Sequence, residues 1–165
     1  MKSLIAPGSF LYEIHIIFGM FTFFIGPLQF IPYLRTHFLK LHRLLGKAYF
    51  FSVLIAGTTG FAISFHTPLA WAAAGTAVQC ILWLLFTGLA FMRIMKKDIA
   101  SHRRWMLRSY MLVLAAPFLR LSIAALENFT TIDYMAHFEL LYPLLVWVSF
   151  LPLLIAEGCI RIRQP

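Results

Sequence analysis

The segment from Leu69 to Arg108 reads LAWAAAGTAVQCILWLLFTGLAFMRIMKKDIASHRRWMLR. Residues 69–92 carry no charged side chain, and about 20 mostly apolar residues suffice for a helix to cross the roughly 30 Å hydrocarbon core of a bilayer. Residues 93–108 then bring six Lys and Arg side chains, which favour the membrane surface. An uncharged span followed by a basic turn predicts a membrane protein.

The same alternation extends over the whole chain of 165 residues, of which 61% are hydrophobic and 12% charged. Soluble domains are about half apolar and about a quarter charged. Backbone groups inside a bilayer must find their hydrogen bonds within the segment, so each apolar run should be helical. We therefore predict an all-α fold, an integral membrane bundle in a single domain over residues 1–165. The five expected transmembrane helices cover residues 10–33, 44–65, 69–92, 106–126 and 138–160.

The distribution of basic residues predicts the orientation. Twelve of the 14 Lys and Arg residues fall in the first connection, the third connection and the C-terminal tail, whereas the second and fourth connections have none. Because cytoplasmic loops are enriched in Lys and Arg, we expect the N-terminus outside and the C-terminus in the cytoplasm. The basic segments would then face anionic lipid headgroups, which accounts for the net charge of +8 without a nucleic-acid partner. The basic residues are Arg35, Lys40, Arg43 and Lys47; Arg93, Lys96, Lys97, Arg103, Arg104 and Arg108; Arg161 and Arg163.

Two of the basic segments contain the same dipeptide, His42-Arg43 and His102-Arg103. Two neutral imidazoles at matched depth on facing helices are the axial ligands that a b-type haem requires. The sequence therefore makes His42 and His102 candidate ligands of a haem iron. The alternative is that both are interfacial residues or helix caps. Cytochrome b subunits that hold two haems place two His about thirteen or fourteen residues apart on one helix; this chain has no such pair within a span, which argues against a two-haem electron path.

Other polar residues lie near the same face and are candidate contacts for the haem or for a quinone headgroup. Tyr49 follows His42 and Tyr110 follows His102, while Arg108 lies two residues before Tyr110. Arg120 completes this set, although it is placed much deeper, about 10 Å below the outer end of the fourth helix at 1.5 Å per residue.

A second polar layer is predicted near the outer face. Glu13, His15 and Glu139 lie at a depth similar to that of Arg120. Ionisable groups inside a membrane are costly and usually face a partner or a cavity. These residues form either an ion pair that fixes helix packing or an outward-facing site for a small molecule.

The segments Gly26-Pro27-Leu28-Gln29-Phe30, HRLLGKAY over 42–49 and HRRWMLRSY over 102–110, with Leu119-Arg120 after them, resemble a bacterial family of predicted multi-pass membrane proteins of unknown function. The resemblance covers most of the chain and implies a location in the bacterial inner membrane. The His pattern is also similar, more loosely, to small haem-b membrane cytochromes.

Three functions remain open from the sequence. The leading hypothesis is a redox-linked membrane protein that binds a b-type haem or a quinone between helices. The second is a protein that transports or binds a small molecule at the outer Glu, His and Arg residues. The third is a non-catalytic membrane subunit, acting as a homo-oligomer or in a larger complex. Whether the chain is an enzyme stays open as well, and no hydrolase or kinase motif is present.

Overall fold

The computed structural model describes residues 9–162 and is helical within them, so the predicted all-α fold with five membrane-spanning segments is confirmed. Three of the membrane-spanning segments are each a single helix: α1 (Phe10–Leu28), α3 (Leu39–Ser64) and α4 (Ala70–Met95). The fourth and fifth spans are each made of two helices, α5 (Ile99–Val113) with α6 (Ala115–Phe129), and α7 (Phe138–Val148) with α8 (Leu151–Ile162). A short helix, α2 (Pro32–His37), separates α1 from α3.

The interruptions follow from proline. The break between α5 and α6 falls at Leu114, three residues before Pro117, and the break between α7 and α8 at Ser149 and Phe150 precedes Pro152. Proline has no backbone N–H and its ring clashes with the preceding turn, so a helix bends or stops just before it. The first span stops at Leu28, before the expected residue 33, because the chain turns and restarts at Pro32, the first residue of α2.

Two helices start earlier than the apolar pattern predicts. The second span begins at Leu39 rather than 44, and the fourth begins at Ile99 rather than 106. Polar residues are compatible with a helix once it leaves the hydrocarbon core, so hydropathy marks the membrane-embedded part and not the helix end. As a result His42 and His102 lie inside α3 and α5, about one turn from their first residues.

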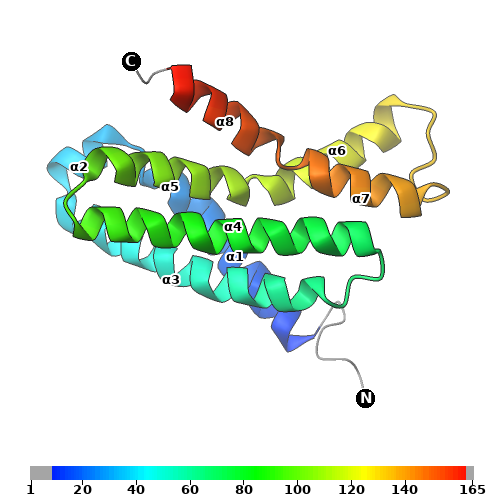
Figure 1. The fold of residues 1–165 in the computed structure, drawn as a ribbon, viewed down its shortest axis with the longest axis horizontal. Helices are drawn as coiled ribbons and strands as arrows, with labels where there is room; N and C mark the ends of the chain where they lie inside the picture. Colours follow the sequence, from blue (N-terminus) through cyan, green and yellow to red (C-terminus); the bar gives the residue numbers. More distant parts are fainter. Residues whose placement is uncertain (1–8, 163–165) are drawn as a thin grey trace.

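Helices α1, α3, α4 and α5 form a ring in which each packs against its neighbours, and α1 closes the ring against α5. Helix α7 packs on α4 and α8 on α5, and α8 diverges from the rest of the bundle (Figure 1). Helix α2, the α4–α5 turn and the C-terminal end of α8 lie toward one end of the molecule, which we call the basic end (Figure 1). Arg163 lies outside the described residues.

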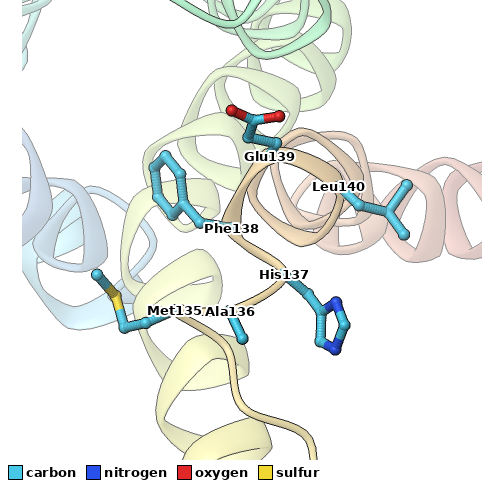
Figure 2. A pocket seen from close by; sticks show the side chains of 6 residues that line it. All are labelled: Met135, Ala136, His137, Phe138, Glu139 and Leu140. Carbon is cyan, nitrogen blue, oxygen red and sulfur yellow. The ribbon is translucent and has the colours of Figure 1, made fainter.

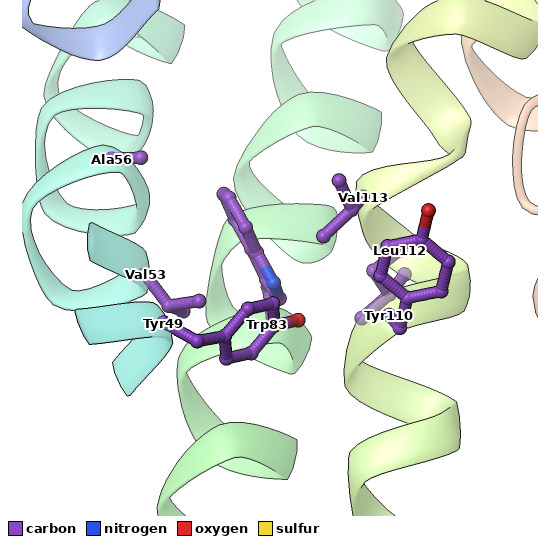
Figure 3. Close-up of a cluster of buried hydrophobic side chains, with 7 residues drawn as sticks. All are labelled: Tyr49, Val53, Ala56, Trp83, Tyr110, Leu112 and Val113. Atoms are coloured by element: carbon purple, nitrogen blue, oxygen red, sulfur yellow. The ribbon is translucent and has the colours of Figure 1, made fainter. Parts of the chain in front are cut away.

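The buried core lies at the centre of the ring and is formed by seven residues (Figure 3), with Trp83 of α4 between the α3 and α5 side chains. Small residues let the helices approach closely, as expected in membranes. Gly57 of α3 faces the Leu84 side chain, and Gly60 faces His15 of α1. The seven core residues are Tyr49, Val53, Ala56, Trp83, Tyr110, Leu112 and Val113.

Candidate functional site

A hydrogen bond joins α3 to α5 across the ring. The Tyr49 hydroxyl lies 2.9 Å from Ser109 Oγ, which in turn lies 2.7 Å from Thr87 Oγ1 on α4. Thr87 donates its one hydroxyl hydrogen to the Trp83 carbonyl at 2.7 Å. Each hydroxyl has a single hydrogen, so Ser109 must donate to Thr87 and Tyr49 to Ser109. We call Tyr49, Ser109 and Thr87 the hydroxyl bridge; its side chains are at most 2% exposed, so it fixes the rotation of three helices.

The hydroxyl bridge fixes the relation between His42 and His102. His42 precedes Tyr49 by seven residues on α3, and His102 precedes Ser109 by seven residues on α5. Seven residues are close to two full turns of an α-helix, so each histidine shares a helix face with its bridge residue, about 10 Å nearer the basic end. The two imidazoles therefore lie at matched depth on facing sides of the ring. They are close enough to interact electrostatically.

The two histidines, which we call the imidazole pair, differ in their hydrogen bonds. Nδ1 of His102 lies 2.8 Å from the Ala90 carbonyl on α4, which can only accept, so Nδ1 carries the hydrogen. When His102 is neutral, its Nε2 is left with a free lone pair, the arrangement seen in histidines that bind metals or accept protons. Nδ1 of His42 is buried and has no hydrogen-bond partner in the described part of the chain.

Gln29 lies beside the same face of α3. Its Oε1 is only 3.3 Å from the position that a Cβ atom would take at Gly46, one turn beyond His42, so Gly46 makes room for this side chain. Gln29 is 7% exposed, and among residues 9–162 its Nε2 has no hydrogen-bond partner. A buried donor without an acceptor costs about 1–3 kcal/mol. The unsatisfied Gln29 Nε2 next to Gly46 thus favours a bound molecule that carries an acceptor atom.

Tyr110 and Arg108 lie close to this layer but make other contacts. The Tyr110 ring packs on Gly26, and its hydroxyl lies 3.5 Å from the Phe23 carbonyl, so it joins α5 to α1. Arg108 points outward from the ring. It donates to both carboxylate oxygens of Glu157 on α8, at 2.8 and 3.1 Å.

The outer candidate residues are only partly brought together. His15 is held in the α1–α3 contact, where its Nδ1 lies 2.8 Å from the Ala56 carbonyl and its ring packs against Gly60. His15 therefore contributes to the packing of α1 against α3. Glu13 lies on the exposed side of α1.

Arg120 and Glu139 are both exposed. Within residues 9–162 the ion pairs are Arg108–Glu157, Arg161–Glu157 and Arg93–Asp98, so the expected pairing of Arg120 with Glu13 or Glu139 is not formed there. Arg120 instead lies within electrostatic range of Tyr142 on α7. Glu139 borders a wide, open hollow formed by residues 135–140 at the start of α7, where its side chain and that of His137 point in different directions (Figure 2).

Sequence reasoning missed Gln29, Ser109, Thr87 and Trp83 as members of the layer. A signal for Ser109 was present, because the interval from His102 to Ser109 equals that from His42 to Tyr49. Tyr49 was paired with Tyr110 because both are tyrosines, so the equal intervals to Tyr49 and Ser109 were overlooked. The contacts of Thr87 and Trp83 depend on the rotation of α4, which hydropathy leaves open.

Comparison with known proteins identifies a family. The family model described as "Predicted membrane protein (DUF2306)" matches residues 12–159. The match spans all five membrane segments and includes every candidate residue named above. No curated protein and no solved structure matches the chain.

Proposed function

The chain belongs to the DUF2306 family of predicted membrane proteins, and on that premise we propose that it is a redox-linked protein of the bacterial inner membrane. In this proposal a quinone headgroup binds between the inner ends of α3 and α5. The observation that carries the proposal is the imidazole pair at matched depth on α3 and α5, with the Gln29 amide beside it that lacks an acceptor among residues 9–162. The orientation has the basic end in the cytoplasm, in line with the positions of Lys and Arg.

The chemistry of these side chains suits a quinone. A quinone has two carbonyl oxygens that accept hydrogen bonds; Gln29 Nε2 is an unsatisfied donor among residues 9–162, and His42 Nδ1 is a second donor in the tautomer that carries its hydrogen there. Reduction of a quinone also takes up protons, which histidine side chains can deliver. Nδ1 of His102 donates to the Ala90 carbonyl, so Nε2 of the neutral ring can accept a proton or bind a metal.

A b-type haem is the second candidate, favoured by that same His102 contact. Among residues 9–162 no group of three or more His, Cys, Asp or Glu side chains is placed to hold a metal ion, so a haem would bring the other iron ligands itself. The two histidines suit its axial positions. The space around them suits a tetrapyrrole less well, because Gln29 occupies the region next to Gly46 and would have to move.

Two measurements on the protein purified in mild detergent test this assignment. The first is the visible spectrum before and after dithionite, where a sharp reduced α-band would assign the site to haem. The second is thermal stability in the presence of short-chain ubiquinone and menaquinone analogues, with sugars and amino acids as controls. We expect a colourless protein that quinones stabilise and the controls do not. A colourless protein that no quinone stabilises would overturn the proposal.

A further inference from the structure

A groove of about 280 Å³ lies between α4, α5 and α8, on the outside of the ring. It forms because α8 turns away from the bundle after the break at Ser149 and Phe150 (Figure 1). Apolar side chains make up most of its walls, and the Arg108–Glu157 ion pair lies among them. The lining residues are Phe86, Trp105, Arg108, Leu153, Leu154 and Glu157.

The groove carries excess positive charge. The Glu157 carboxylate binds Arg108 and also lies 3.4 Å from Nε of Arg161, so two guanidinium groups share one carboxylate. The Arg108 guanidinium also lies 4.6 Å from the centre of the Trp105 ring. Nε of Arg161 faces Glu157 and the Arg161 side chain is 77% exposed, so its terminal nitrogens are accessible to an anion.

The surroundings of the groove indicate which class of molecule would bind in it. The groove opens beside a membrane-spanning helix, where the medium is lipid, and its apolar walls suit an acyl chain. Arg104 lies one turn from Arg108 toward the basic end, so it and Arg161 are placed for a phosphate group at the bilayer surface. A zwitterionic lipid would leave the excess charge uncompensated.

We propose that this groove is a specific binding site for one anionic phospholipid of the leaflet at the basic end. The acyl chain lies along Phe86, Leu153 and Leu154, and the headgroup phosphate meets Arg161. The lipid thereby fills the gap between α8 and the ring. This site is separate from the imidazole pair, so its existence does not depend on the proposed function.

The test is native mass spectrometry of the protein released from nanodiscs of mixed phosphatidylglycerol and phosphatidylcholine. Wild-type protein should keep one phosphatidylglycerol in preference to phosphatidylcholine by about tenfold. Arg161→Gln should lower that preference at least threefold, and Leu153→Trp, which fills the groove, should abolish retention. Inorganic phosphate added to the detergent-solubilised protein should not displace the lipid, because the acyl chain contributes to binding.

Arg103→Gln is the matched control, since Arg103 is an exposed arginine near the basic end and does not line the groove. It should leave retention unchanged. Equal losses in Arg103→Gln and Arg161→Gln would show a diffuse basic surface and overturn the proposal. Unchanged retention in Leu153→Trp would do the same, and the melting temperature of each variant checks that it is folded.

Discussion

Gly26 shows how one residue fixes the contact between two helices. A Cβ atom at this position would clash with the Tyr110 ring, whereas no atom of residues 9–162 lies within 4 Å of a Cβ added at Gly19 on the same helix. We expect Gly26→Ala to destabilise the protein by about 1–3 kcal/mol, since overpacking displaces a buried ring. Gly19→Ala should be neutral or slightly stabilising. Denaturant titration in detergent measures both, and equal effects would contradict the packing described for Tyr110.

Asp98 caps α5, and its carboxylate accepts a hydrogen bond of 3.0 Å from the Ser101 backbone N–H. This bond, with smaller contributions from Arg93 and Arg104, holds the pKa of Asp98 below its usual value. A pKa lowered by folding means that the ionised form stabilises the fold at neutral pH and that this gain disappears as the pH falls through the lowered pKa, below about 3.8.

The matched variant is Asp98→Asn, which can still cap a helix but does not ionise. Thermal unfolding between pH 3 and pH 7 should show wild-type stability falling toward that of the variant at the acid end. Parallel curves over the whole range would contradict the role of the charge.

At the scale of elements, the Arg108–Glu157 ion pair is the main polar link between α5 and α8. The two side chains are 14% and 30% exposed and make two hydrogen bonds. A double-mutant cycle with Arg108→Met and Glu157→Met should give a coupling of about 1.5–3 kcal/mol, as for hydrogen bonds between charged groups. Glu157→Met should lower the free energy of unfolding more than Arg108→Met does. It leaves the Arg108 charge unpaired, and Arg108 is the more buried of the two side chains. A coupling near zero would show that α8 is held by apolar contacts alone.

The elements also show what the sequence could predict. Hydropathy located all five spans, because the length of an apolar run reports directly on the bilayer. It placed the starts of α3 and α5 too late, since polar residues continue a helix beyond the hydrocarbon core. The depth of His42 and His102 follows from counting residues. The rotation that makes them face each other, by contrast, depends on the bond between Tyr49 and Ser109, which no single-helix pattern contains.

In the outer polar layer the ion-pair alternative is not formed within residues 9–162, and the small-molecule site stays a prediction. Depth alone suggested that Arg120 would meet Glu13 or Glu139, but α6 bends away at the break before Pro117 and Arg120 is exposed. A helix that bends changes the direction of every side chain beyond the bend. Residue counting cannot supply that angle.

For the whole molecule, the proposed orientation is open to a direct test. A phosphatase or fluorescent reporter fused after Pro165 should report a cytoplasmic location, and one placed in the α3–α4 turn should report the opposite side. The reason is that Lys and Arg in the short connections resist translocation. If each reporter gave the location expected for the other, the orientation would be the reverse and the imidazole pair would lie at the external face.

The central claim is that one ligand lies between His42 and His102. Its most direct test is the dissociation constant of a short-chain quinone for wild-type protein and for His42→Ala, His102→Ala and His66→Ala, the last removing an exposed histidine at the opposite end of α3. Each of the first two variants should weaken binding about tenfold, equivalent to about 1.4 kcal/mol and typical of one lost hydrogen bond, while His66→Ala leaves it unchanged. Wild-type affinity in the His42→Ala/His102→Ala double variant would contradict the claim.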